Sequence, residues 1–225
     1  MTPSPPVALL GGTFDPVHYG HLRFADDVRR ALGLKEVRLI PARDPPHRAG
    51  PAATPADRLA MLQLGALEFP GLVVDERELR RDGKSYTVLT LEEFRREDPL
   101  RPLWLLLGAD AFRGLPAWHR WREIFAIAHV VVVARPGVAL AVDLPEVLSA
   151  EWHNRRTLDP AVLFSTPAGA IFEARIAPQP IAATEIRAQL ERGDNGRRAV
   201  AGLLPPAVLA YIERHDLYSI PKDAT

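Results

Sequence analysis

The chain has 225 residues, enough for one large domain or two small ones, and a chain of this length can bury a core without disulfide staples. Its 28 Lys and Arg residues balance 28 Asp and Glu residues, which argues against a broad nucleic-acid surface or a polybasic membrane anchor. Cysteine is absent, so a disulfide framework, a thiolate zinc site and a cysteine nucleophile are excluded. Because no apolar run approaches about 18 residues and residues 1–6 lack signal-peptide features, we expect a cytoplasmic protein without membrane contact.

Short apolar runs alternate with longer helical patterns, which is typical of βαβ units around a parallel sheet. Strands covered on both faces are predicted at Val7–Leu10, Val37–Ile40, Leu72–Asp75, Leu103–Leu107 and Val130–Ala134. Helices are predicted at His18–Leu32, Pro55–Glu68, Thr87–Glu97, Trp118–Ala128, Glu185–Arg192 and Pro206–His215. Thr54 and Thr184 are each expected to cap the helix that follows. Within 136–180 we expect a helix near Pro145–His153 and a strand near Ala170–Arg175.

This order of elements predicts an α/β fold: a Rossmann-like doubly wound parallel sheet with a small C-terminal helical extension. The whole chain, 1–225, is expected to form a single domain, with a disordered tail at 1–6 and the helical extension at about 181–218. A ligand is expected at the carboxyl ends of the strands.

The segment Gly11–His21 reads GGTFDPVHYGH and lies where a predicted strand ends and a helix begins. Gly11 and Gly12 are expected to let the backbone approach a ligand and to take unusual dihedral angles, and Asp15-Pro16 predicts a turn. His18 and His21 are three residues apart, so they share one face at the positive end of the helix dipole.

Two histidines at a helix N-terminus are suited to bind phosphate, although this spacing alone also fits a pair of surface or capping histidines. The strand, Gly-Gly, turn and helix context favours phosphate binding. The segment is neither a Walker A loop nor a Gly-x-Gly-x-x-Gly dinucleotide fingerprint.

The sequence His18-Tyr19-Gly20-His21 resembles the His-x-Gly-His motif of the nucleotidyltransferase superfamily, and Gly11–His21 resembles the bacterial nicotinate-nucleotide adenylyltransferase family. The resemblance runs collinearly from Val7 to about Tyr218. It implies adenylyl transfer from ATP to nicotinate mononucleotide, giving nicotinate adenine dinucleotide and pyrophosphate in NAD biosynthesis. The catalytic residues that it implies are His18, His21, Thr184 and Arg187. The ATP-binding residues that it implies are these four together with Gly11, Gly12, Thr13, Phe14, Gly108, Asp110 and Arg135.

The resemblance implies that two further segments bind the mononucleotide. Ile40–Arg48 reads in isolation as a proline-stiffened polar loop, but the resemblance implies that His47 and Arg48 reach toward the phosphates, with Arg48 in place of a lysine. Ser85-Tyr86-Thr87 opens a predicted helix, where free N–H groups could bind a carboxylate and where Ser85 or Thr87 could equally be an ordinary cap. The resemblance implies that this segment holds the nicotinate end.

Gly108 and Asp110 follow a buried strand, where a carboxylate can accept ribose hydroxyls. Trp118 and Trp121 are three apart on the predicted helix, a spacing that by itself favours core packing. The resemblance implies instead that Trp118 stacks on the pyridine ring, that the backbone at His119 meets its carboxylate, and that Trp121 packs inside.

Thr184 and Arg187 are three apart and can face one phosphate group, although a lone Thr-x-x-Arg also fits a capped helix with a surface arginine. Ala182 stands where the family usually has serine, so one expected hydroxyl near the phosphates is missing. The turn Val133–Gly137, which contains Arg135, resembles the segment of the family that lies near adenine and ribose.

The implied nucleophile is the phosphate of the mononucleotide, already ionised at pH 7 because its second pKa is about 6, so no side-chain nucleophile is needed. Mg²⁺ is expected to be carried by the ATP phosphates, since no carboxylate cage is evident. The alternatives are a dual-specificity or nicotinamide mononucleotide adenylyltransferase and, in a different class, a non-catalytic nucleotide-binding sensor. No nucleic-acid partner is expected, and the oligomeric state, a homo-oligomer included, stays open.

Overall fold

A computed structural model describes residues 4–45, 51–134, 140–176 and 179–219. Its seven-stranded sheet has the order β3-β2-β1-β4-β5-β7-β6, and every pair of neighbours is parallel. The strands are β1 (Val7–Gly12), β2 (Val37–Pro41), β3 (Leu72–Val74), β4 (Leu103–Gly108), β5 (His129–Ala134), β6 (Arg156–Thr157) and β7 (Ile171–Arg175). Because β1 lies between β2 and β4, the strand order reverses there, and a crevice is expected at the carboxyl ends of β1 and β4.

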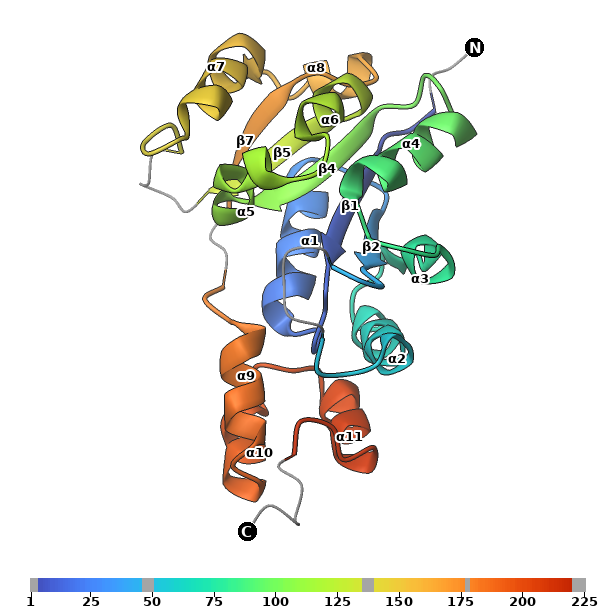
Figure 1. Cartoon of the computed structure of the whole chain (residues 1–225), viewed down its shortest axis with the longest axis vertical. Coiled ribbons are helices and arrows are strands. Elements are labelled where there is room, and N and C mark those ends of the chain that lie inside the picture. Colours follow the sequence, from blue (N-terminus) through green and yellow to red (C-terminus); the bar gives the residue numbers. More distant parts are fainter. Residues whose placement is uncertain (1–3, 46–50, 135–139, 177–178, 220–225) are drawn as a thin grey trace.

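The helices are α1 (Tyr19–Ala31), α2 (Pro55–Ala66), α3 (Arg77–Arg80), α4 (Thr87–Glu97), α5 (Ala109–Arg113), the 3₁₀ turn η1 (Leu115–Ala117), α6 (Trp121–Ile127), α7 (Glu146–Arg155), α8 (Val162–Ser165), α9 (Ala183–Leu190), α10 (Asp194–Val200) and α11 (Pro206–Arg214). Figure 1 shows α9, α10 and α11 gathered at one end of the molecule, away from α7 and α8. The predicted fold class, a doubly wound parallel sheet with a C-terminal helical extension, is confirmed.

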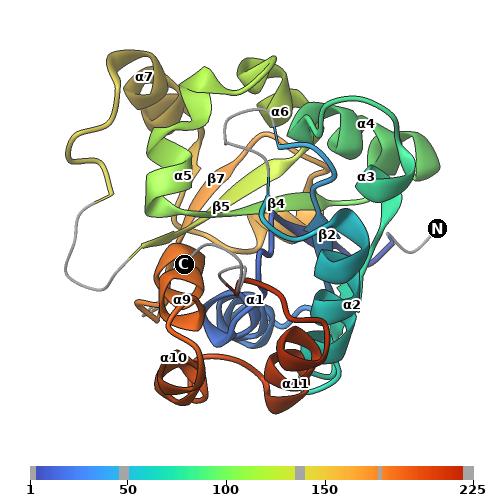
Figure 2. The ribbon, with the colours of Figure 1, turned by 60° about the horizontal axis from the view of Figure 1, so that its bottom comes forward.

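Alternation along the strands divides the core into two layers. In β4, Trp104 and Leu106 face the layer of α1, α2, α9 and α11, whereas Leu105 and Leu107 face the layer of α4, α5 and α6. Figure 2 shows these two groups of helices on opposite sides of the sheet. Burial on both faces explains why the strands are almost continuously apolar in sequence.

Three predicted helix starts can be compared with the structure. Thr54 caps α2 as expected, because its Oγ1 accepts the Asp57 N–H at 3.2 Å. Thr184 does not cap a helix: α9 begins one residue earlier, at Ala183, with Ala182 at the N-cap. The prediction of a helix over Trp118–Ala128 is also wrong at its start, because Arg120 takes a left-handed φ of 52° and α6 begins only at Trp121.

Residues 4–6 of the expected tail are described, and there the Pro5 carbonyl accepts a hydrogen bond from Arg101 Nε at 2.7 Å. The sequence patterns did not predict α3, α5, η1, β6, α8 or α10. Most of these are shorter than two helical turns, so they offer too few residues to display a 3.6-residue period.

Candidate active site

The loop between β1 and α1 closes around the ring of Phe14. A Cβ on Gly12 would lie 3.0 Å from Cζ of Phe14, so the missing side chain makes room for this buried ring. The expectation that Gly11 and Gly12 take unusual dihedral angles is wrong, since neither has a positive φ, and Phe14 instead takes a φ of 50°. The Asp15–Pro16 peptide that follows is cis.

His18 and His21 lie together at the start of α1. His18 is the N-cap residue, and its ring stacks on that of His21 with centroids 3.7 Å apart and 24° between the planes. A Cβ on Gly20 would come within 2.8 Å of His18 Nδ1. The glycine between the two histidines therefore lets the His18 ring fold over the first turn and reach its neighbour.

The imidazole of His18 is buried and neutral. Only 3% of the residue is exposed, and Nδ1 has no hydrogen-bond partner within the described ranges. Burial lowers the pKa of His18 to about 4, because desolvation disfavours the imidazolium. A bound anion would oppose this effect, since a nearby negative charge favours the protonated ring.

Two adjoining hollows open where β1 and β4 end, beside the start of α1. One, of about 720 Å³, is lined by Gly11, Thr13, His21, Thr184 and Arg187 among others. The other, of about 670 Å³, contains His18, His21, Gly108, Asp110 and Thr184 in its lining. The two share residues of β1, α1 and α9, so segments far apart in sequence meet at one edge of the sheet. We refer to these two hollows together as the outer hollows.

Arg187 and Thr184 reach this edge from α9. The guanidinium of Arg187 donates from Nη1 to the Asp15 carbonyl at 2.7 Å and lies 3.8 Å from Asp15 Oδ2. Thr184 is exposed. The loop after β1 thus fixes Arg187, which still has further N–H donors for an anion.

Gly108 and Asp110 lie at the end of β4. Gly108 is the last residue of this strand and the N-cap of α5. Asp110 is in the first turn of α5, with an exposed carboxylate 3.3 Å from Arg113 Nη1.

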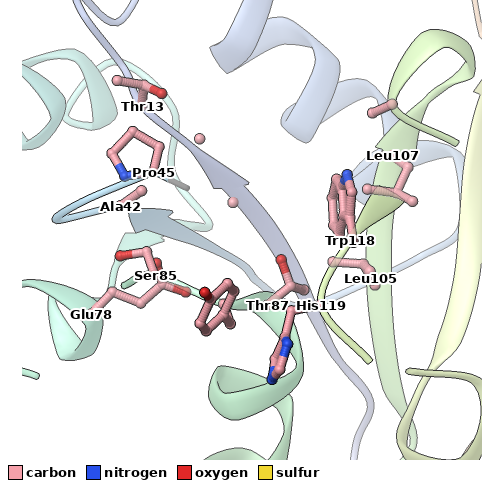
Figure 3. A pocket seen from close by; sticks show the side chains of 14 residues that line it. Thr13, Ala42, Pro45, Glu78, Ser85, Thr87, Leu105, Leu107, Trp118 and His119 are labelled. Atoms are coloured by element: carbon pink, nitrogen blue, oxygen red, sulfur yellow. The ribbon is translucent and has the colours of Figure 1, made fainter. Parts of the chain in front are cut away.

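A third hollow, of about 300 Å³, lies between the sheet edge and α4, and we call it the inner hollow. In Figure 3, Trp118 lies on one side of it beside Leu107, with Ser85 and Glu78 across from it. Trp118 follows η1 and is half-buried, not part of the helix that carries Trp121, which packs in the core as expected. The Tyr86 and His119 rings approach each other with centroids 4.3 Å apart.

The N-terminus of α4 opens toward the inner hollow without a side-chain cap. Tyr86 is the N-cap residue and makes no capping hydrogen bond, so neither Ser85 nor Thr87 is an ordinary helix cap. The Ser85 hydroxyl instead accepts the Arg43 N–H at 2.9 Å. The N–H groups of Thr87 and Val88 have no acceptor within the helix, as is general for the first residues of a helix.

Buried polar residues that the sequence patterns did not single out support these loops. Arg58 of α2 is fully buried and donates from Nη1 to the Thr13 carbonyl at 2.8 Å and to the Ala42 carbonyl at 2.6 Å. Its Nη2 donates to the Arg43 carbonyl at 3.2 Å. Arg58 thus ties the loop after β1 to the loop after β2.

Asp15 holds two more segments at this edge. Its carboxylate accepts the Ala52 and Ala53 N–H groups at 2.8 and 3.1 Å and the Tyr218 hydroxyl at 2.7 Å. The motif around Asp15 suggested only a turn, and no spacing rule connects it with Tyr218. The C-terminal segment therefore belongs to the support of the outer hollows.

Three predicted site residues, His47, Arg48 and Arg135, lie outside the described residues. Within the described ranges, no group of three or more histidine, aspartate or glutamate side chains is arranged to hold a metal ion. The helices in the same ranges are all too short or too polar to span a membrane.

Comparisons with known proteins agree with this geometry. Residues 9–189 match the cytidylyltransferase-like family model. The chain is 50% identical over 216 residues to a probable nicotinate-nucleotide adenylyltransferase of Halorhodospira halophila, covering 96% of each chain. It is 51% identical over 221 residues to a protein of the same name from Laribacter hongkongensis, covering 97% of each.

Among solved structures, the fold is similar to that of Plasmodium falciparum nicotinic acid mononucleotide adenylyltransferase complexed with NaAD. The TM-score is 0.71 at 16% identity, with 96% of this chain and 98% of that chain covered, and this likeness concerns the fold alone. Identity near one half over almost the whole length is much stronger, and it agrees with the His18–His21 motif. The chain therefore belongs to the cytidylyltransferase-like family and, within it, to the nicotinate-nucleotide adenylyltransferases.

Proposed function

We propose that this enzyme transfers the adenylyl group of ATP to nicotinate mononucleotide, giving nicotinate adenine dinucleotide and pyrophosphate. The observation that carries the proposal is that the outer hollows, with the His18–His21 pair, adjoin the inner hollow at the end of β1. Relatives about half identical over nearly the full length carry the name of this activity. The triphosphate would occupy the outer hollows, and the pyridine ring would occupy the inner hollow.

The reaction joins two anions, so the protein must position them and stabilise negative charge. An oxygen of the mononucleotide phosphate attacks the α-phosphorus of ATP, a new P–O bond forms, and the bond to the bridging oxygen of the β-phosphate breaks. The electron pair of that bond leaves with pyrophosphate. We assign charge stabilisation to His18, His21, Thr184 and Arg187, which line the outer hollows.

ATP is proposed to lie along the loop after β1, next to Gly11, Gly12, Thr13 and Phe14, all of which line the outer hollows. Gly108 and Asp110 would receive the ribose, because the Asp110 carboxylate is exposed and can accept its hydroxyls. We also assign Arg135 to ATP from the sequence resemblance alone.

The mononucleotide is proposed to place its pyridine ring against Trp118 and its acid group at the Ser85–Thr87 segment and the His119 N–H. Within that segment the Ser85 and Tyr86 N–H groups donate to the Asp44 and Lys84 carbonyls, so the Thr87 N–H is the donor proposed for the acid. These backbone groups are donors, so a nicotinamide NH₂ would meet a donor and stay unpaired. One unpaired buried group costs about 1–3 kcal/mol, which favours the acid over the amide. His47 and Arg48 are assigned to the mononucleotide from the resemblance.

Nucleotidyltransferases of this kind generally use a divalent metal ion together with ATP. We propose that the ion is Mg²⁺. Since the described side chains form no metal-binding cluster, phosphate oxygens and water would be its main ligands. We further propose a cytoplasmic location, supported by bacterial relatives that carry the name of the same metabolic enzyme.

The test is pyrophosphate release by the full chain with ATP, measured side by side with nicotinate and nicotinamide mononucleotides. We expect turnover with the acid and a kcat/KM at least about tenfold lower with the amide, as one unpaired donor predicts. Equal or higher kcat/KM with the amide would favour a dual-specificity or nicotinamide enzyme. Tight ATP binding without pyrophosphate release would favour a non-catalytic sensor.

The variant His18→Ala, with exposed His153→Ala of α7 as the matched control, connects this activity to the His18–His21 pair. We expect kcat to fall at least about tenfold in the first variant and to stay unchanged in the second. Near-wild-type turnover of His18→Ala would remove His18 from the mechanism.

A further inference from the structure

A carboxyl group lies in the hollow where we place a negatively charged substrate. Glu78 of α3 is 7% exposed and lines the inner hollow, where it is the acidic side chain among the lining residues that the structure describes. Figure 3 shows it beside Ser85, across the hollow from Trp118. Adenylyl transfer as proposed above gives this group no role, and a bare charge here would repel the acid of the substrate.

Two hydroxyl side chains lie against this carboxyl. Thr90 Oγ1 donates to Glu78 Oε1 at 2.5 Å, and the Ser85 side chain lies beside the same carboxyl, close enough to lower its pKa. Ser85 precedes the N-cap of α4, whereas Thr90 lies one turn inside the helix. Glu78 thus contacts residues on both sides of Thr87, the first residue of α4, where the free N–H groups of the helix lie.

The same network extends to the loop after β2. Ser85 Oγ accepts the N–H groups of Arg43 and Asp44 at 2.9 and 3.4 Å, which leaves its own hydrogen available for the Glu78 carboxyl beside it. On the other side, Thr90 Oγ1 accepts from Arg81 Nη2 at 3.0 Å, and its hydrogen is likewise directed to Glu78. Both hydroxyls are therefore polarised toward the carboxyl group, which has to accept from each.

The charge of the carboxyl is moderated by its surroundings. Burial is the largest influence and raises the pKa of Glu78, while the hydrogen bonds from Thr90 and Ser85 and the nearby Arg81 oppose the rise. Arg81 Nη2 lies 3.9 Å from Oε1 of Glu78. The Arg81 guanidinium and the hydroxyl donors offset part of the charge of the ionised group, and the raised pKa favours its neutral form, so both effects reduce its repulsion of a bound acid.

We propose that Glu78 is a positioning residue for the mononucleotide, fixing the Ser85–Thr87 segment so that the backbone N–H groups of α4 face the acid of the pyridine ring. The proposal rests on the proposed function. Glu78 acts through Ser85 and Thr90 and does not touch the reacting phosphates. It therefore sets the affinity for the mononucleotide and the preference for acid over amide, and leaves ATP binding and the chemical step nearly unchanged.

The variant Glu78→Gln tests this directly. A glutamine can accept from one hydroxyl through its oxygen but presents an NH₂ to the other. Because Ser85 Oγ already accepts two N–H groups, it has no lone pair for that NH₂. The segment must then shift or leave a buried donor unpaired.

We expect Glu78→Gln to raise the KM for nicotinate mononucleotide at least about tenfold, with the KM for ATP and kcat within about twofold of wild type. The ratio of kcat/KM for acid over amide should fall by a similar factor. Glu76→Gln, two residues earlier, is the matched control, because Glu76 pairs with exposed Arg80 outside the hollow. Equal changes in both KM values, or an unchanged KM for the mononucleotide, would overturn the proposal.

A second variant, Ser85→Ala, keeps the test decisive if Glu78→Gln folds poorly. Calorimetric binding of nicotinate mononucleotide should weaken in Ser85→Ala while ATP binding stays within about twofold of wild type, and an unchanged affinity for the mononucleotide would overturn the proposal. Where Glu78→Gln folds, the double variant should lose less than the sum of the single losses, because both changes break one network, and additive losses would overturn the coupling. If wild type and variants bind and turn over the mononucleotide equally well, only the role of Glu78 is refuted. If wild type itself neither binds nor turns over the mononucleotide, the proposed function is refuted as well.

Discussion

Lowering the pH is expected to destabilise the free enzyme, with a large share of the effect coming from His18. Its ring is 3% exposed and stacked on His21, and its Nδ1 has no hydrogen-bond partner in the described part of the chain. Burial lowers the pKa of His18 to about 4 from an ordinary value of 6.5. The folded protein therefore resists the proton that the unfolded chain accepts.

The sign and size of the effect follow from this difference. Because the folded pKa is the lower one, stability is fully present above the unfolded pKa near 6.5 and decreases as the pH falls toward about 4. At about pH 5 protonation of His18 stabilises the unfolded state by about 2 kcal/mol relative to the folded state, because this pH lies about 1.5 units below the unfolded pKa and still above the folded pKa. Well below about pH 4 the full loss is about 3 kcal/mol.

The assay is urea unfolding of wild type and His18→Asn at several pH values between about 7.5 and 5. Asparagine is a favourable N-cap residue and does not titrate, so it suits the position. His129, whose pKa is lowered by burial, and Glu78, whose pKa is raised by burial, titrate in both proteins, so their contributions cancel in the comparison. Wild type should lose about 2 kcal/mol more than the variant on acidification to about pH 5. Parallel pH profiles for the two proteins would refute the argument.

Two further predictions concern the support of the site and its aromatic wall. Arg58→Lys keeps the charge but cannot reach all three carbonyls of Thr13, Ala42 and Arg43, so the free energy of unfolding should fall by about 3 kcal/mol in urea titrations. The exposed control Arg96→Lys should be neutral, and an equally stable Arg58→Lys would show that these hydrogen bonds contribute little. Trp118→Ala should raise the KM for the mononucleotide more than the KM for ATP in steady-state kinetics, because Trp118 lines the inner hollow. Equal effects on both KM values would count against stacking on the pyridine ring.

The strands were predictable because a strand that is buried on both faces has a continuous run of apolar residues in the sequence. Thus β2 and β4 each extend only one residue beyond the runs Val37–Ile40 and Leu103–Leu107. The start of α6 was not predictable from spacing, because the turn through η1 and the left-handed Arg120 interrupts a segment whose apolar residues still fit a helical period. Short elements such as α3, with four residues, lack enough length for any period to show.

The candidate site divides in the same way. The His18–His21 motif was readable because all of its geometry is local: a strand end, a turn and one helical turn with Gly20 beneath the His18 ring. The groups that support it come from long-range hydrogen bonds, such as the bond from Tyr218 to Asp15 across 203 residues of sequence. No local pattern encodes such a contact, and Arg58 resembles any other arginine of a helix in the sequence.

The buried polar residues suggest how this site keeps its shape. The described core contains Asp15, His18, Asp26, Arg58, Glu78, Ser85, Thr90 and His129, and all of these except Asp26 and His129 line or support the hollows at the carboxyl edge of the sheet. Burying a polar or charged group costs free energy unless it is hydrogen-bonded, so a chain selected for stability alone would not concentrate them in one place. Their concentration here is expected if loops from several parts of the chain must be held rigidly around two anions. Zero net charge is compatible with this arrangement, because the site depends on where a few donors are fixed and not on the overall balance of charge.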